Sequence, residues 1–287
     1  EALSPFFRNH VNYSALLVFM VPIQLASFHL ATSKAQKTLL LFSLAIVLAA
    51  LYFSYARGAW LALAAGLVSY GLIRKGWLFK SFLIAVLVVM AAVVWLQHND
   101  RYLAFAPHFE STVFHEDFTD HLAATYKGKD VSTAERFNRW VAGANMSKER
   151  WGTGFGPTTF YQQYKEYTVP AFRTWVSDNP EKSTVHNYFL LLWIEQGILG
   201  LLLFLLLLGS MFWYAQKIYR QTISRFWKVT VAAIGAILWM QCTVNFLSDL
   251  IETDKVGSVF YLCLSFLIIA DMHSKNEGDK RSTGLPV

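Results

Sequence analysis

Charged residues are scarce in this sequence. Asp, Glu, Lys and Arg make up only 15% of its 287 residues, whereas a soluble domain carries about 25%. Three apolar runs contain no charge at all: Leu39–Phe53, Phe82–Leu96 and Leu199–Leu208. Crossing the hydrocarbon core of a bilayer takes about 20 mainly apolar residues, and about seven segments qualify. The composition therefore excludes an ordinary soluble protein and predicts an all-α integral membrane protein.

Twelve of the 25 basic residues lie in four short clusters at the ends of apolar segments. With seven spans, all four clusters fall on one side of the membrane, and the positive-inside rule makes that side the cytoplasm. Lysines and arginines at helix ends account for the net charge of +6, so we expect no nucleic-acid partner. The clusters are Lys34 and Lys37; Arg74, Lys75 and Lys80; Lys217, Arg220, Arg225 and Lys228; and Lys275, Lys280 and Arg281.

Cysteine is also scarce. Cys242 and Cys263 both lie inside apolar runs, so the sequence predicts no disulfide framework. No initiator methionine or signal peptide precedes the first apolar segment, although that span enters the membrane from the outer face. We therefore expect further spans ahead of Glu1, in a longer protein of which this chain is the C-terminal part.

The expected architecture is a multi-span helical bundle with one large, partly helical loop on the outer face. Four parts follow one another: spans in 1–97, the loop in 98–185, spans in 186–273 and a cytoplasmic tail in 274–287. Seven spans are expected, at about 11–30, 37–56, 59–73 and 78–97, in the run opened by His186, and at about 228–247 and 256–272.

The first half of the loop is acidic. Asp100–Asp130 carries six acidic residues against three basic ones. Its histidines and acids suggest a metal site, but a His-Glu-x-x-His motif would need a histidine where Thr119 stands. We therefore expect no metal and no cofactor, and interpret this half as a solvated or dynamic lid. The ligands considered are His108, His115, Glu116, Asp117, Asp120 and His121.

The second half of the loop begins with a predicted helix. Ser132–Glu135 matches a capping box, and an apolar stripe with helical spacing accompanies it: Ala134, Phe137, Val141 and Ala144. We expect an amphipathic helix over 132–147 that lies against the outer, membrane-facing surface. Arg136 and Arg139 project from its flanks, either as headgroup contacts or, for Arg136, as an anion-binding group.

Glycines alternate in the segment Trp151–Pro157. The segment lacks the preceding strand and the Gly-Lys-Ser/Thr of nucleotide fingerprints, but its glycines permit close approach of the backbone to a ligand. The aromatic residues that follow are consistent with stacking on sugar rings or with an interfacial belt. They are Tyr161, Tyr164, Tyr167, Phe172 and Trp175.

Arg57 stands at the one polar break in a long apolar stretch, Lys37–Ile73. This stretch would measure roughly 55 Å as one helix against a core of about 30 Å, so it must fold back at residues 56–58. A lone arginine at this outer turn suits a planar clamp for an anion, although snorkelling to headgroups is the alternative.

His186 lies where the polar loop meets the longest apolar run, close to the membrane surface, and any chemistry is expected there. Glu195 follows nine residues later, on the opposite face of a regular helix. We therefore interpret Glu195 as a structural acid that bonds a neighbouring helix, which Gly197 and Gly200 would allow to approach closely.

Four polar residues converge on the outer face by topology alone: Arg57, Arg136, His186 and Asp249. The sequence has no nucleotide motif, and the extracytoplasmic space offers little ATP. A transfer reaction there needs a substrate that brings its own leaving group, and a lipid-linked diphosphate sugar meets that need. The residues expected to line the same cavity are Asp249, Asn187 and Arg139.

Four short motifs stand in a fixed order around the loop. They are Arg57-Gly58-Ala59-Trp60; Arg136-Phe137 ahead of Trp140; Gly154-Phe155-Gly156; and His186-Asn187-Tyr188-Phe189-Leu190 with Glu195-Gln196-Gly197. In these motifs, and from Asn12 to about Leu267, the sequence resembles the O-antigen ligase and polymerase superfamily. The resemblance implies a GT-C-like membrane fold of about twelve spans, of which some five would be absent here.

The resemblance further implies a metal-independent, inverting glycosyltransferase of the bacterial inner membrane with its site facing the periplasm. It would move a glycan from undecaprenyl diphosphate to lipid A core (a ligase, which we prefer), to another glycan (a polymerase) or to a protein hydroxyl (an O-oligosaccharyltransferase). His186 would be the general base on the acceptor hydroxyl. Arg57 and Arg136 would hold the diphosphate and stabilise its charge as it leaves.

A non-catalytic lipid-glycan transporter or flippase is the alternative from another class. A transporter should place paired polar groups near the bilayer midplane and show inverted repeats. In this sequence the polar groups gather at one face, and no repeat is found. These features favour the enzyme.

Overall fold

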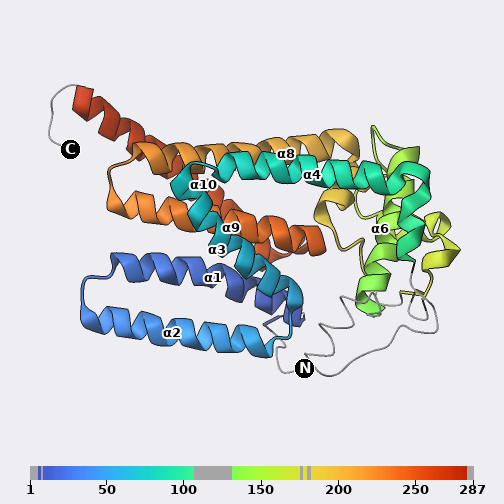
Figure 1. Ribbon diagram of the computed structural model, residues 1–287, viewed down its shortest axis with the longest axis horizontal. Helices are drawn as coiled ribbons and strands as arrows, with labels where there is room; N and C mark the ends of the chain where they lie inside the picture. Colours follow the sequence, from blue (N-terminus) through green and yellow to red (C-terminus); the bar gives the residue numbers. More distant parts are fainter. Residues whose placement is uncertain (1–5, 8, 107–130, 175–176, 180–181, 283–287) are drawn as a thin grey trace. The chain divides into compact units, whose positions relative to one another are not determined.

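The computed structural model describes residues 6–7, 9–106, 131–174, 177–179 and 182–282. All regular structure in these ranges is helical (Figure 1). In chain order the helices are α1 (His10–Leu30), α2 (Lys34–Phe53), α3 (Arg57–Lys75), α4 (Leu78–Gln97), η1 (His98–Phe105), α6 (Val131–Glu149), α7 (Phe160–Gln163), η3 (Tyr164–Tyr167), η4 (Pro170–Phe172), α8 (Tyr188–Gln221), α9 (Arg225–Leu247), η5 (Leu250–Glu252) and α10 (Asp254–Ser282).

Six helices in the described part of the chain are long and apolar enough to cross a membrane: α1, α2, α4, α8, α9 and α10. The predicted multi-span helical membrane protein is therefore confirmed. The remaining expected span, at about 59–73, coincides with α3, a regular helix of 19 residues. The helix α3 is not among the six.

The chain divides into two compact units. Unit 1 contains Glu1–Ile84, Leu207–Val244 and Leu250–Val287, and unit 2 contains Ala85–Leu206 and Asn245–Asp249. Neither unit is one continuous piece of sequence, so long-range contacts define both.

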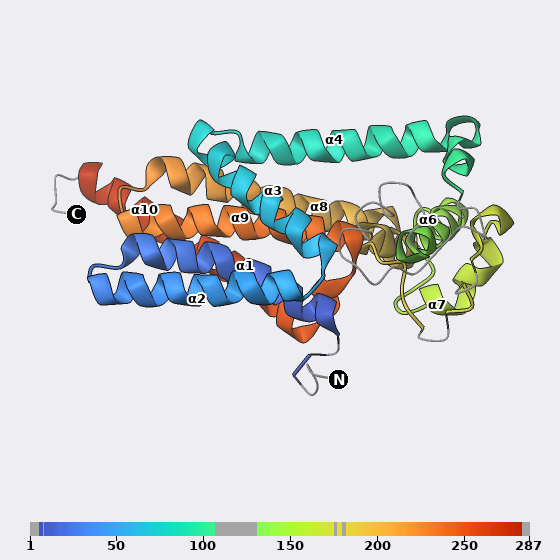
Figure 2. The same ribbon diagram turned by 60° about the horizontal axis from the view of Figure 1, so that its bottom comes forward.

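In unit 1, α1 and α2 form a hairpin whose helices lie side by side in both views (Figures 1 and 2). Ser33 and Gln36 form a complete capping box at the start of α2, which satisfies backbone groups that the first turn leaves unpaired. Within the hairpin, Gln24 Nε2 donates to Ser43 Oγ at 2.7 Å. A side-chain hydrogen bond between helices is a common device of membrane bundles.

The turn from α3 to α4, also in unit 1, is closed by a side chain from α8. Gly76 ends α3 in the left-handed conformation, with φ +77°, which glycine adopts without steric cost. Gln216 Nε2 donates to the carbonyl of Ile73 at 3.1 Å, and Gln216 Oε1 accepts from Leu78 N at 3.0 Å. One buried amide thus bonds a carbonyl in the last turn of one helix and an N–H in the first turn of the next.

The helix α8 is too long to be one span. Its 34 residues would measure about 51 Å against a core of about 30 Å. The helix is broken at Gly197, where φ is 69° and ψ is −174°. The stretch after the break, 198–221, measures about 36 Å, which suits a membrane span. The residues before the break belong to unit 2 and form part of its core.

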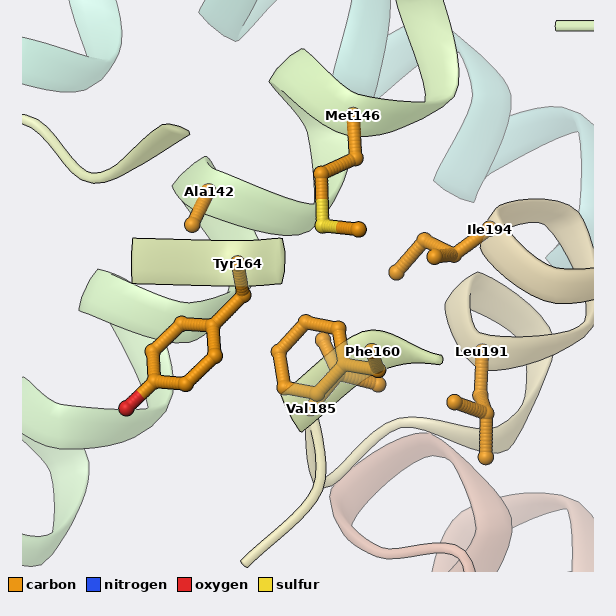
Figure 3. Close-up of a cluster of buried hydrophobic side chains, with 7 residues drawn as sticks. All are labelled: Ala142, Met146, Phe160, Tyr164, Val185, Leu191 and Ile194. Carbon is orange, nitrogen blue, oxygen red and sulfur yellow. The ribbon is translucent and has the colours of Figure 1, made fainter. Parts of the chain in front are cut away.

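The core of unit 2 joins the end of the loop to the first turns of α8. Figure 3 shows side chains from α6, α7, η3 and α8 that point toward one another. The cluster consists of Ala142, Met146, Phe160, Tyr164, Val185, Leu191 and Ile194, all at most 3% exposed. Two aromatic residues that the sequence offered for sugar stacking, Tyr164 and Phe172, are buried at 1% and 0% exposure. They therefore stabilise the protein core; Trp175 lies outside the described residues.

The helix predicted at 132–147 is present as α6, but its buried face differs from the predicted one. The apolar stripe includes Phe137, Val141 and Ala144, which are only partly buried. The residues that α6 buries instead include three polar ones: Glu135, Asn138 and Arg139, at 6%, 2% and 7% exposure. Ala134, the first residue of the stripe, is also buried, at 4% exposure. The helix α6 therefore packs into unit 2 through a face that includes polar side chains, and the expected docking of its apolar stripe on the membrane surface stays a prediction.

Candidate functional site

His186 lies on the turn that leads into α8. Its backbone is in the left-handed region, with φ +55°, which costs a non-glycine residue about 1–2 kcal/mol. Val185 before it is fully buried and Asn187 after it is 7% exposed. The turn is therefore held at both sides, and it presents a half-buried imidazole. Strained residues held by their surroundings cluster at functional sites.

Asn187 begins α8. Its Oδ1 accepts a hydrogen bond from Leu190 N at 3.0 Å, and its carbonyl accepts one from Leu191 N at 2.9 Å. This is the geometry of an N-cap. The side chain of Asn187 therefore fixes the direction in which the helix leaves His186.

Asp249 follows the end of α9 and lies beside the His186 turn in unit 2. Thr184 Oγ1 donates to Asp249 Oδ2 at 2.7 Å. Tyr188 N donates to the carbonyl of Ser248 at 3.1 Å. Two hydrogen bonds thus attach the connection after α9 to the chain on either side of His186.

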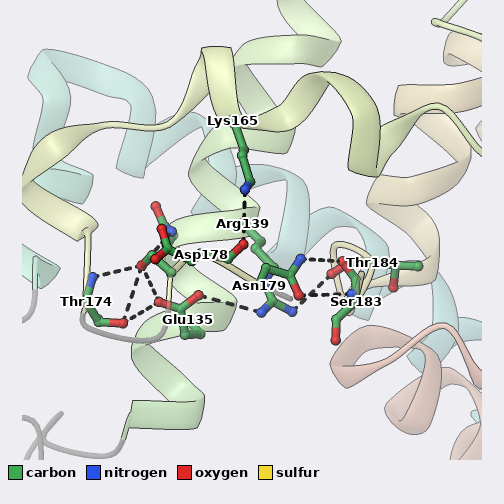
Figure 4. A network of polar contacts seen from close by, with 10 residues as sticks. Glu135, Arg139, Lys165, Thr174, Asp178, Asn179, Ser183 and Thr184 are labelled. Atoms are coloured by element: carbon green, nitrogen blue, oxygen red, sulfur yellow. Dashed lines mark hydrogen bonds and ion pairs between the residues drawn. The ribbon is translucent and has the colours of Figure 1, made fainter. Parts of the chain in front are cut away.

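Arg139 and Glu135 form a buried ion pair one turn apart on α6 (Figure 4). Arg139 Nη2 lies 3.6 Å from Glu135 Oε2, and both side chains are 8% exposed. Arg139 Nη1 donates to the carbonyl of Thr184 at 3.4 Å. Glu135 Oε1 accepts from the hydroxyls of Thr174 and Ser177, the latter at 2.5 Å. The pair thus joins α6 to the segment before His186. Glu135 Oε2 has no hydrogen-bond partner among the described residues.

The pKa of His186 is lowered from its ordinary value of 6.5 to about 4. Burial of the imidazole is the main cause, because a low-dielectric surrounding disfavours the charged form. The positive charges of Arg139 and Arg136 lower the pKa further, and the carboxylate of Asp249 acts in the opposite direction. The imidazole is therefore neutral at pH 7 and able to accept a proton.

Arg57 belongs to unit 1, where it is the first residue of α3. The predicted break is present, since α2 ends at Phe53 and α3 begins at Arg57. Unit 2 by itself therefore brings together the other candidates, which are Arg136, Arg139, His186, Asn187 and Asp249.

The candidate metal ligands in the acidic half of the loop lie outside the described residues. They are His108, His115, Glu116, Asp117, Asp120 and His121. Within the part of the chain that the structure describes, no group of three or more His, Cys, Asp or Glu residues is placed to hold a metal ion.

Glu195 is bonded by the glycine-rich segment. Its backbone carbonyl accepts from Gly156 N at 2.9 Å, and its carboxyl group interacts with the backbone of Thr158, Thr159 and Phe160. The expected bond from Glu195 to a neighbouring helix stays a prediction.

The glycines at 152–156 approach α8 closely, where the sequence suggested a ligand. A Cβ on Gly154 would lie 2.6 Å from the carbonyl oxygen of Glu195, and a Cβ on Gly197 would lie 2.1 Å from that of Gly152. Three backbone hydrogen bonds join the segments: Phe155 N to Ile194 O (2.8 Å), Gly156 N to Glu195 O (2.9 Å) and Ile198 N to Trp151 O (2.9 Å). The motif is therefore a packing device that supports the helix carrying His186 at its start.

A family model described as O-antigen ligase matches residues 42–205, more than half of the chain. The chain belongs to the O-antigen ligase family. The matched region contains Arg57, Arg136, Arg139 and His186. A relative from Salmonella typhimurium, named O-antigen ligase, is 28% identical over 212 residues. The alignment covers 73% of this chain and 48% of the relative, so the chain spans about half the length of that protein.

Sequence reasoning missed the polar residues that support the His186 turn. Asn179 brackets Ser183 with two hydrogen bonds: Asn179 Oδ1 accepts from Ser183 N at 3.0 Å, and Asn179 Nδ2 donates to Ser183 O at 2.9 Å. Asn179 is 3% exposed and has a φ of +48°, a conformation in which asparagine is enriched. No sequence pattern indicates that Asn179 pairs with Ser183; the asparagine itself was the only indication.

Proposed function

We propose that this protein is a membrane-bound ligase that transfers a glycan from undecaprenyl diphosphate to an acceptor hydroxyl, with lipid A core as the preferred acceptor. The observation that carries the proposal is a neutral histidine on a strained turn between two arginines and a carboxylate. Family membership supports the same reaction class. The reaction takes place at the periplasmic face of a bacterial inner membrane.

His186 acts as the general base. Its neutral imidazole accepts the proton of the acceptor hydroxyl, and the oxygen attacks the anomeric carbon of the donor sugar. The bond from that carbon to the diphosphate oxygen breaks, and undecaprenyl diphosphate leaves with the electron pair. Attack opposite the leaving group inverts the anomeric centre. Asp249 stabilises the imidazolium that forms.

Arg136 and Arg57 bind the diphosphate. Guanidinium groups pair with phosphate oxygens in a planar, bidentate arrangement, and they stabilise the charge that grows on the leaving group. The donor itself carries negative charge next to Arg136 and Arg139. Its arrival offsets their positive charges and raises the pKa of His186, which brings the base closer to the ideal strength for proton transfer near pH 7.

The test is a transfer assay with the membrane-embedded protein. The donor is an undecaprenyl-diphosphate glycan, and lipid A core, a second glycan unit and a hydroxyl-bearing protein are offered in separate reactions. The mass of each acceptor shows which one gains the glycan. We expect lipid A core; a gain on the glycan identifies a polymerase, and one on the protein an O-oligosaccharyltransferase.

A matched pair of variants ties the reaction to the site. His186→Ala should abolish transfer while leaving membrane insertion intact. His98→Ala removes an exposed histidine of η1 and should leave transfer unchanged. Transfer by His186→Ala at the wild-type rate would refute the proposal.

A further inference from the structure

Arg139 is a buried guanidinium with few and long contacts. Its Nε has no hydrogen-bond partner among the described residues. Its ion pair with Glu135 measures 3.6 Å and its bond to Thr184 O 3.4 Å, whereas charge-assisted bonds measure about 2.7–2.9 Å. Buried pairs of this kind contribute little to stability. Its contact with Thr184 therefore suggests a role other than stability.

Arg139 touches the residue on which the His186 turn depends. The carbonyl of Thr184 accepts from Arg139, its hydroxyl donates to Asp249 at 2.7 Å, and the same oxygen accepts from His186 N at 3.4 Å. Thr184 is thus the common contact of the arginine, the carboxylate and the histidine backbone. A shift of Thr184 moves all three.

Glu135 holds Arg139 from the other side. Its carboxylate accepts from the hydroxyls of Thr174 and Ser177, and Thr174 N donates to Ser177 Oγ at 2.8 Å. Asn138 Nδ2 lies 3.4 Å from the same hydroxyl. These bonds fix the carboxylate, and the carboxylate then limits where the guanidinium can lie.

We propose that the Glu135–Arg139 pair is the positioning element of the site: Glu135 holds Arg139, and Arg139 holds the Thr184 carbonyl and so the turn that presents His186. The inference rests on the proposed function for its reaction, but not for its geometry. The charged groups that face His186 are Arg136 and Arg139 from α6 and Asp249 after α9. The carboxylate of Glu195 on α8 in turn interacts with Asp249.

The first experiment needs no transfer activity. Diethyl pyrocarbonate acylates neutral imidazole, so the rate of acylation at His186, followed by mass spectrometry across pH 3–8 and normalised to exposed His98, reports the pKa of His186. In the wild type the rate should be half-maximal near pH 4. Arg139→Gln removes a positive charge, so this midpoint should move up toward 6.5. Lys148→Gln, at an exposed position of α6, should leave it unchanged.

The second experiment measures transfer by the same variants. Because a displacement of about 1 Å at a reacting group costs about 100-fold, Arg139→Gln should lower kcat by about 10- to 100-fold with less than a threefold change in the KM for the donor. Glu135→Gln should also lower kcat. Arg139→Lys keeps the charge without the fork, so its acylation midpoint should stay near the wild-type value while its kcat lies between those of the wild type and Arg139→Gln.

The outcomes distinguish the positioning role of Arg139 from the proposed transfer function. A wild-type kcat in Arg139→Gln, or an acylation midpoint that does not move, overturns the positioning role. If Arg139→Gln does not fold, Arg139→Lys decides, and a wild-type kcat in that variant overturns it. A midpoint that moves while the wild type transfers no glycan upholds the proximity of Arg139 to His186 and refutes the proposed function.

Discussion

Replacing Gly197 by alanine tests how the loop is joined to α8. The residue has φ 69° and ψ −174°, a region that is essentially restricted to glycine. A Cβ there would lie 2.1 Å from the carbonyl oxygen of Gly152 and 2.8 Å from Thr153 N. Both neighbours are backbone atoms, so no side chain can rotate away. The segments must separate.

The expected loss of stability follows from these contacts. Backbone strain in a glycine-only region costs about 1–3 kcal/mol. Separation of the segments also breaks three backbone hydrogen bonds, each of which contributes about 0.5–1.5 kcal/mol. The sum is about 2.5–7.5 kcal/mol. A change of 1 kcal/mol shifts the Tm by about 2–4 °C for a protein of this size, so Gly197→Ala should melt at least about 5 °C lower.

The assay is thermal unfolding in detergent, with amide hydrogen exchange as a local readout. The amides of Phe155, Gly156 and Ile198 should lose protection in Gly197→Ala. The matched control is Gly152→Ala in the same motif, where an added Cβ meets nothing within 4 Å. If Gly197→Ala melts within about 1 °C of this control, the reasoning about the junction is refuted.

Three further predictions concern the reaction. Arg57→Lys keeps the charge but loses the planar fork, so transfer should fall at least about tenfold; near-normal transfer would mean that Arg57 only anchors its helix to headgroups. Because His186 must be neutral to act as a base and its pKa is about 4, kcat/KM should rise with pH through about 4 and then stay level. If the diphosphate binds beside Arg136 and Arg139 as proposed, it offsets their charges, and the acid limb of kcat should lie at higher pH. Two limbs that coincide near 6.5 would contradict the effect of the two arginines on His186. Transfer should persist in EDTA, and a strict metal requirement would point back to segment 107–130.

The helices themselves were largely predictable. Runs of about 20 apolar residues identify spans whatever their neighbours are, and the break at Arg57 followed from length alone. The helix α6 was also predictable, because helical periodicity is a local property. Which face of α6 is buried was not predictable from the sequence. Glu135 and Arg139 lie inside because they bond Thr174, Ser177 and Thr184, which are 39 or more positions from their partners in the sequence.

The candidate site was only half predictable. Position at the outer end of a span drew attention to His186, and the same topological argument brought in Asp249. No sequence pattern indicated the left-handed backbone of His186. None indicated that Thr184 contacts Arg139, Asp249 and the backbone of His186. The alternating glycines indicated a place of close approach, but not its contact with α8, because the sequence does not show that α8 breaks at Gly197.

The sequence by itself determined the membrane class and the approximate limits of the long helices, and it supplied the candidate residues for chemistry. These depend on composition and on spacings of a few residues, which local hydrophobicity and hydrogen bonding decide. Only the tertiary structure decided which of those residues meet. The bond from Thr184 to Asp249 and the buried pair of Glu135 and Arg139 depend on contacts between distant segments, and burial in a low-dielectric core gives the imidazole of His186 its low pKa.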